Sequence, residues 1–264
     1  MTHTTVPQDP PARRAGFMPA TLILIGLAVV LAVAAVAAAR LLGADRTFET
    51  RSHTQMADGA ESAEVRMQFG AGNLSLGALD ATDSALSRMD FEGPSSLRPD
   101  TSYQVRGSVG ELGYVSRDAD QVWQNLPFIG RAHDHADLRV RFAPSLPLTL
   151  DVEAGAADTM LDLSRLRVAR LDLQTGAADT RVRLPEAAGF TTLLVKAGLA
   201  QLTIEVPSGV AADIEVAAAL GGRAIDQARF QPLGNGRYRS PDYATAANRV
   251  EMHLELGIGD LSVH

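Results

Sequence analysis

The sequence predicts an all-β domain, a stacked repeat that is β-solenoid-like in the manner of a single-stranded β-helix, preceded by one N-terminal transmembrane helix. Three observations predict this arrangement in a chain of 264 residues. A long apolar run lies near the N-terminus, a ten-residue motif recurs along the rest of the chain, and apolar residues alternate with polar ones beside each motif. No sustained helical spacing of apolar residues follows residue 60, which favours β-structure throughout.

The apolar run covers residues 17–39, FMPATLILIGLAVVLAVAAVAAA, and contains no charged residue. At about 1.5 Å per residue, a helix of this length spans roughly 35 Å, enough to cross a hydrocarbon core of about 30 Å. The proline-rich residues 1–16 are predicted to form a disordered cytoplasmic tail, and residues 40–60 a polar linker. We therefore expect a single-pass protein of the cell membrane.

A cleaved signal peptide is the alternative, because the small residues of AAVAAAR offer an A-x-A cleavage pattern. The apolar regions of signal peptides run about 7–15 residues, so the longer run favours a retained anchor. Arginines flank the run on both sides and do not decide its orientation. Since large domains translocate with little regard to flanking charge, we expect residues 61–264 to lie outside the cytoplasm.

A ten-residue motif occurs six times, and in most copies a glycine lies at its fourth position. The copies begin at Met67, Val152, Leu173, Val195, Val216 and Leu254. The four central copies are spaced by 21, 22 and 21 residues, and such a regular step is typical of repeat architectures. A looser seventh copy begins at Val105.

Each copy is predicted to form a strand, a glycine corner and a second strand. Leu148, Leu150 and Val152 alternate with polar residues, which is the period of a half-buried strand, and the alternation resumes after the corner. The Asp or Asn that follows the corner glycine by three residues is expected to bond its own turn backbone. Positive φ, which side chains disfavour, is expected at the corner glycines Gly70, Gly155, Gly176, Gly198 and Gly257.

A unit of about 21 residues cannot bury its own apolar face, but stacked units cover one another. We therefore expect Val152, Leu173 and Val195 to line up in one column. The copies at 67–76 and 254–263 are expected to form related rungs near the two ends of the stack. The alternative is an antiparallel meander of hairpins rolled into a sandwich, and the regular step favours stacking over it.

Residues 77–147 and 226–250 depart from the repeat and are predicted to be insertions against the stack. The first contains the single tryptophan, Trp123, and the second contains Gly-Asn-Gly, which is typical of a hairpin tip. A surface specific for a partner is expected in these insertions, with Trp123 as its weak candidate contact residue.

The stretch from Trp123 to Val206 resembles the toast-rack domain of LiaF-like cell-envelope stress proteins and, more loosely, the related adhesin β-domains. The resemblance is carried by Trp123, Leu126, the run DLRVRFAPSLPLTLDVEAGAADTMLDLSRLRVARLDLQTGAADTRVRLP and the segment KAGLAQLTIEVPSGV. With the similar motifs at 70–73 and 257–260, it extends over residues 61–264. The resemblance implies a membrane-tethered β-domain without enzymatic activity, linked to envelope stress sensing or signalling.

Charge and residue content exclude several kinds of site. The net charge of −7 argues against nucleic-acid binding, and the absence of cysteine excludes disulfides and thiol catalysis. No G-x-S-x-G, P-loop or H-E-x-x-H motif occurs, so we predict neither catalytic residues nor a cofactor. His133 and His135 are weak candidates for a metal site, since alternate residues of a strand share a face, but no third ligand has a defined spacing.

The sequence therefore leads us to expect a non-enzymatic module that takes part in envelope stress sensing or regulation by binding a protein or a cell-wall component. A structural or adhesin-like surface module is the alternative, and an uncharacterised hydrolase is a weaker one. Exposed strand edges at the ends of the stack would allow homo-oligomers to form.

Overall fold

The computed structural model describes residues 47–116, 136–177, 179–199 and 201–264, all within one compact unit, Ala44–His264. These residues form seventeen β-strands and one 3-10 turn, Ser95–Leu97, with no α-helix among them, which confirms the all-β prediction for this unit. No helix in these ranges has the length and apolar character needed to cross a membrane. The predicted tail (1–16) and anchor (17–39) lie outside the described residues.

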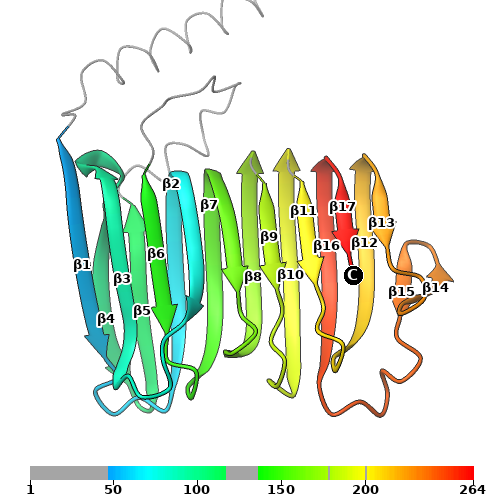
Figure 1. Ribbon diagram of the computed structural model, residues 1–264, viewed down its shortest axis with the longest axis horizontal. Coiled ribbons are helices and arrows are strands. Elements are labelled where there is room, and N and C mark those ends of the chain that lie inside the picture. The colour runs from blue at the N-terminus through cyan, green and yellow to red at the C-terminus, as the bar shows by residue number, and fades with distance from the viewer. Residues whose placement is uncertain (1–46, 117–135, 178, 200) are drawn as a thin grey trace, which may run out of the picture. The chain divides into compact units, whose positions relative to one another are not determined.

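Six bent units, here called rungs, stack side by side in two layers (Figure 1). Two rungs are single long strands that pass through both layers, β2 (Ser62–Ala78) and β7 (Pro147–Asp162). The other four rungs pair a long strand of the first layer with a short strand of the second: β8 (Arg167–Ala177) with β9 (Thr180–Arg183), β10 (Phe190–Leu199) with β11 (Leu202–Glu205), β12 (Ala211–Leu220) with β13 (Arg223–Ile225), and β16 (Arg249–Ile258) with β17 (Leu261–Val263). All six copies of the repeated motif form such bends.

Neighbouring rungs are parallel and in register, as the regular step predicts. Val152 pairs with Leu173, and Leu173 pairs with Val195, so the predicted column exists. It continues through Leu254 to Val216 at one end and through Met67 at the other. All six side chains are at most 5% exposed, so each rung covers the apolar side chain of the next.

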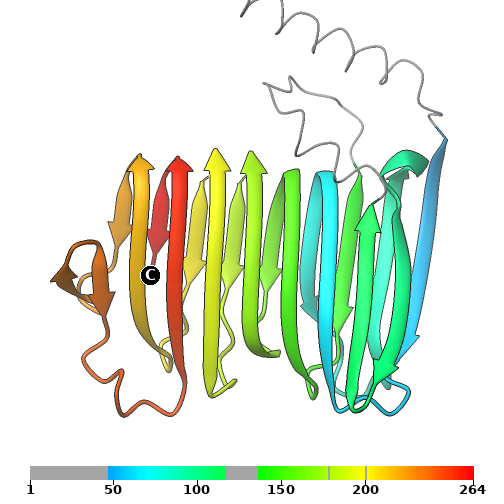
Figure 2. The same cartoon turned by 180° about the vertical axis from the view of Figure 1, so that it is seen from behind.

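The rungs do not follow one another in chain order. In space the order is β2, β7, β8–β9, β10–β11, β16–β17 and β12–β13, because β16 pairs with both β10 and β12. Figure 2 shows the C-terminal strands between the two earlier rungs. The prediction of a continuously winding, single-stranded β-helix was therefore wrong. The copy at 254–263 forms the last rung but one and not the end of the stack.

Five further strands complete the N-terminal end of this unit: β1 (Phe48–Met56), β3 (Ala85–Pro94), β4 (Pro99–Arg106), β5 (Val109–Ser116) and β6 (Asp137–Phe142). β5 and β6 extend the two layers by parallel pairing with β2. β4 and β5 form an antiparallel hairpin around Gly107, so the looser seventh copy from Val105 is a hairpin and not a rung. β1 pairs antiparallel with β3 and lies within the segment 40–60 that its polar sequence suggested was a linker.

The corner glycines are needed for space and not for positive φ, which corrects the sequence prediction. A Cβ on Gly198 would lie 2.8 Å from the carbonyl oxygen of Gly176, and one on Gly176 would lie 2.5 Å from that of Gly155. Positive φ occurs instead two residues further along, at Gly72 and Gly259. The glycines therefore allow the backbones of successive rungs to approach closely.

The acidic corner residues accept hydrogen bonds from the neighbouring rung. The prediction that they bond their own turn was wrong. The Oδ1 atom of Asp158 accepts a hydrogen bond of 3.3 Å from the backbone N–H of Asp179. The Oδ1 atom of Asp260 accepts one of 2.8 Å from Gly222. In this way each bond ties two rungs together at a point where the backbone changes layers.

A hairpin pairs with the outer edge of the last strand of the first layer. Its strands are β14 (Gln231–Gly234) and β15 (Arg237–Arg239), and β15 pairs antiparallel with β12. The connecting residues, Asn235 and Gly236, have φ of 52° and 76°, as in the tight turns that suit hairpins. This confirms the hairpin tip predicted from Gly-Asn-Gly.

Candidate binding surface

A groove of about 1210 Å³ runs across the strands on the outer side of the corners. We call it the corner groove. It crosses β7, β8, β10, β16 and β12 and ends at the tip of the β14–β15 hairpin. Its lining consists of Ala156, Gln174–Ala177, Lys196–Leu199, Val216–Ala219, Arg223, Asn235, Gly236 and Glu255–Gly257.

The repeat itself builds the corner groove. Gln174, Lys196 and Glu255 are register partners and form one wall, because residues in register on parallel strands point to the same side. The floor contains Gly176, Gly198 and Gly257, which have no side chains to fill it. Ala177 and Leu199, also register partners, form the opposite wall.

Beside the corner groove lies a row of exposed apolar side chains, here called the corner row: Leu199, Ile258 and Leu220. Leu199 pairs with Ile258, and Ile258 pairs with Leu220, so the three side chains are adjacent. They are 51%, 52% and 64% exposed, respectively. Single exposed apolar residues are ordinary, but adjoining ones beside a concave surface are typical of a binding site.

Two cations and one carboxylate line the corner groove. Lys196 is the register partner of Glu255. The guanidinium of Arg223 donates one hydrogen bond of 3.0 Å to the carbonyl oxygen of Ala218, and its Nη1 atom lies 4.0 Å from where a Cβ on Gly236 would be. Arg223 is therefore the charged residue that lines the groove end nearest the hairpin.

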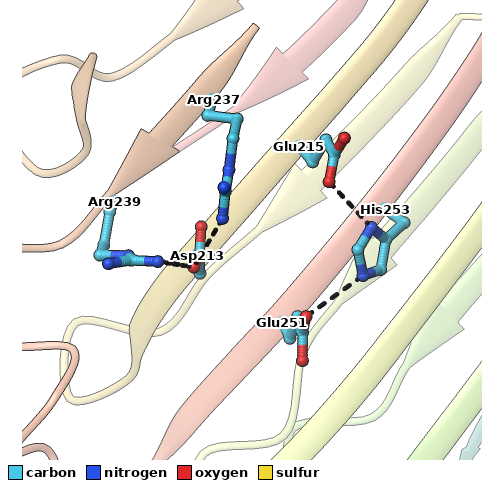
Figure 3. A network of polar contacts seen from close by, with 6 residues as sticks. All are labelled: Asp213, Glu215, Arg237, Arg239, Glu251 and His253. Carbon is cyan, nitrogen blue, oxygen red and sulfur yellow. Dashed lines mark hydrogen bonds and ion pairs between the residues drawn. The ribbon is translucent and has the colours of Figure 1, made fainter. Parts of the chain in front are cut away.

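A polar network on the outer face of the first layer holds the hairpin at this end (Figure 3). Asp213 of β12, whose side chain is 11% exposed, accepts hydrogen bonds from Arg239, one of them 3.0 Å long from Nε, and lies 3.5 Å from Arg237. The hydrogen bond to Asp213 and the charge of that carboxylate raise the pKa of Arg239. Arg239 also lies over the ring of Tyr243, whose pKa burial raises.

A second group of polar contacts, centred on His253, lies beside this network. Its two ring nitrogens lie 3.3 Å from Glu215 and 3.3 Å from Glu251, which come from β12 and β16 (Figure 3). No group of three or more His, Cys, Asp or Glu residues suitable for a metal ion occurs in the part of the chain that the structure describes. The arrangement joins two strands and offers no nucleophile with an adjacent base.

The structure does not place at this surface the residues that the sequence singled out. Trp123, His133 and His135 lie outside the described residues. The second predicted insertion, 226–250, does contribute, because the hairpin tip closes one end of the corner groove. The groove walls were missed because Gln174, Lys196 and Glu255 are far apart in sequence, although their equal positions in successive motif copies were a usable signal.

Comparison with known proteins supports the fold. The structure is similar to the crystal structure of a candidate cell adhesion protein from Clostridium sporogenes, with a TM-score of 0.74 and 16% identity, covering 82% of this chain and 99% of that one. Candidate adhesins from Bacteroides fragilis (TM-score 0.31, 8% identity, 83% and 98% covered) and Parabacteroides distasonis (TM-score 0.27, 12% identity, 83% and 98% covered) are also similar. No curated protein matches the chain.

A family model gives a direct assignment. The model described as the N-terminal domain of toast_rack, DUF2154, matches residues 44–205, which include β1 and the rungs from β2 to β11. The match covers more than half of the chain and begins just before the first strand. By this match and by its stacked rungs, the chain belongs to the toast-rack family.

Proposed function

We propose that this protein is a membrane-tethered, non-enzymatic module that binds a protein or an envelope component and so takes part in cell-envelope stress sensing or regulation. The observation that carries the proposal is the corner groove with the corner row beside it. It is a concave surface with an apolar floor and a few polar groups, which is the general form of a binding site. The described residues offer binding chemistry there and no catalytic constellation.

The place where the chain enters the described unit supports the tether. Thr50 of β1 lies level with the corner residue Asp158, because successive register pairs across neighbouring strands link the two. These pairs are Thr50 with Glu92, Glu92 with Asp137, Asp137 with Asn73, and Asn73 with Asp158. β1 therefore begins at the edge of the unit where the corners lie (Figure 1). The apolar residues 17–39 precede this point by fewer than ten residues. The proposed tether would therefore be joined to β1 by a short connecting segment, with the domain outside the cytoplasm.

The test is site-specific photo-cross-linking of the full chain in intact cells. A photoreactive amino acid replaces Leu199 in the corner row, and in a matched variant it replaces Thr203, which lies on the outer face of the second layer. We expect a discrete cross-linked partner from position 199 and none from position 203. Equal products from both positions, or none from either, would refute the assignment of this surface.

Membrane association is tested separately. The full chain is expected in the membrane fraction after carbonate washing, and a variant without residues 17–39 is expected in the soluble fraction. Protease added to intact cells should degrade residues 61–264. Protection of that region would place the domain on the other side of the membrane.

An adhesin-like role is the second candidate, and the similarity in fold to the Clostridium sporogenes protein favours it. Among the described residues, β1 and β4 each pair on one side only, so their free edges could join other strands. In that case the purified full chain would self-associate in detergent, and a charge introduced at Thr50 would prevent it. A regulatory module would instead yield a separate protein partner in the cross-linking experiment.

A further inference from the structure

We propose that the corner groove holds the acyl chain of an anionic single-chain lipid, with the chain lying across the strands and the acid group beside Arg223. This inference rests on the proposed binding role of the same groove and names the chemistry of its ligand. Three properties of the described residues carry it: the dimensions of the groove, the small apolar residues of its floor, and the position of its cations.

The dimensions suit one extended chain. The groove crosses five strands, and four spacings of about 4.8 Å give a length of roughly 19 Å. A bilayer core of about 30 Å contains two leaflets, so one lipid tail extends roughly 15 Å. Because the rungs are parallel and in register, the floor is straight, as an extended chain requires.

The floor suits an apolar ligand better than a glycan. It consists of glycines and alanines from successive rungs, and no charged side chain lies on it. No aromatic ring lines the groove among the described residues, so a sugar would find no stacking surface. A methylene chain needs no such surface and gains free energy by leaving water for apolar side chains such as Leu199.

The cations place the acid group. Arg223 lies at the hairpin end of the groove, where it uses one N–H on Ala218 and has further donors for an oxyanion. Lys196 lies halfway along the wall and is offset by its neighbour Glu255. The net attraction for an anion is therefore strongest at Arg223, and the tail would extend from there over Gly257, Gly198 and Gly176 toward Ala156.

The experiment uses the full chain in phosphatidylcholine nanodiscs with a photoactivatable palmitate that carries a diazirine on its tail. Cross-linked peptides are identified by mass spectrometry. We expect labelling to be concentrated on the floor and walls of the groove, in residues 174–177, 196–199 and 255–257. Labelling spread evenly over the outer faces of both layers would overturn the proposal.

Variants test the groove and the cation independently. Ala217→Phe and Ala177→Phe each put a ring into the groove and should abolish labelling, whereas Thr203→Phe, on the outer face of the second layer, should label like the wild type. Thermal unfolding followed by circular dichroism confirms that each variant is folded. Two separate groove variants keep the test decisive if one of them fails to fold, and retention of labelling in a folded groove variant would contradict the proposal.

Arg223→Gln should weaken palmitate labelling by about tenfold, the expected size of one charge-assisted contact. Labelling by the uncharged alcohol of the same length should not change. An equal loss for both ligands would assign Arg223 a structural role and refute the placement of the acid group. If position 199 still cross-links a protein while palmitate labels nothing, the ligand class is wrong and the binding role stands.

Discussion

Replacing Gly198 with alanine tests why the corners contain glycine. The new Cβ would lie 2.8 Å from the carbonyl oxygen of Gly176, whereas ordinary contacts of this kind begin near 3.4 Å. The obstructing atom is backbone within the stack, so relief requires two rungs to separate. Overpacking of this kind costs about 1–3 kcal/mol, and in a domain of this size each kcal/mol lowers Tm by about 2–4 °C.

Gly209→Ala is the matched control for this variant. Nothing lies within 4 Å of its ideal Cβ and its φ is not positive, so the substitution should leave stability within about 0.5 kcal/mol or raise it slightly. Urea unfolding of the full chain in detergent, followed by circular dichroism, measures both free energies of unfolding.

Gly198→Asn separates the two explanations for the glycine. Asparagine tolerates positive φ but carries a Cβ, so a contact-based cost predicts that Asn is at least as damaging as Ala. If Asn were tolerated and Ala were not, conformation would explain the glycine and the contact would not. Equal effects of alanine at positions 198 and 209 would likewise refute the reasoning.

Three further predictions concern the core, the pH dependence and the hairpin. Leu173→Ala removes a side chain that is 1% exposed from the central column and should cost about 2–5 kcal/mol in urea unfolding, whereas Leu199→Ala in the corner row should change stability by about 0.5 kcal/mol or less. Burial raises the pKa of the Tyr114 phenol, and the hydrogen bond with Ser87 offsets this only in part. Because the folded form then holds this proton more tightly than the unfolded form, the contribution of Tyr114 to stability should be constant below about pH 10 and fall above it, so the alkaline loss of stability should be shallower in Tyr114→Phe. Asp213→Asn should loosen the hairpin, seen as faster hydrogen exchange in β12 and β15 with little change at β8, and unchanged exchange would show that the arginine contacts do not hold it.

The stacked core was predictable because its cause is periodic. Val152, Leu173 and Val195 recur at an almost constant spacing, and identical spacing in neighbouring rungs is what brings them into one column. The hairpin tip at Asn235 and Gly236 was predictable for a local reason, since only a few residue pairs adopt positive φ without strain.

The order of the rungs was not predictable from the same pattern. All copies present similar apolar rows, so the spacing cannot tell which copy becomes the neighbour of β10. β1 was missed for a different reason. One of its faces carries Glu49, Arg51, His53 and Gln55, no residue of the strand is buried, and it joins the structure through its backbone ladder with β3.

The candidate site was missed because it is formed by glycines, which have no side chains. The corner groove exists where glycines from three rungs lie side by side, and each glycine alone reads as a turn residue. Predicting a hollow from sequence requires knowing that these positions stack on the outer side of a bend. That information lies in the register between rungs.

The insertion of β16–β17 between β10–β11 and β12–β13 has a consequence for synthesis on the ribosome. The chain emerges from its N-terminus, so residues 211–225 are released before the segment that must separate them from residues 190–205. Until residues 249–263 leave the exit tunnel, each flanking rung lacks its neighbour on that side, and its apolar row remains open to aggregation or to a chaperone. Completion of the stack therefore waits for residues 249–263, and termination before them would leave a gap inside the stack and not merely a shorter one.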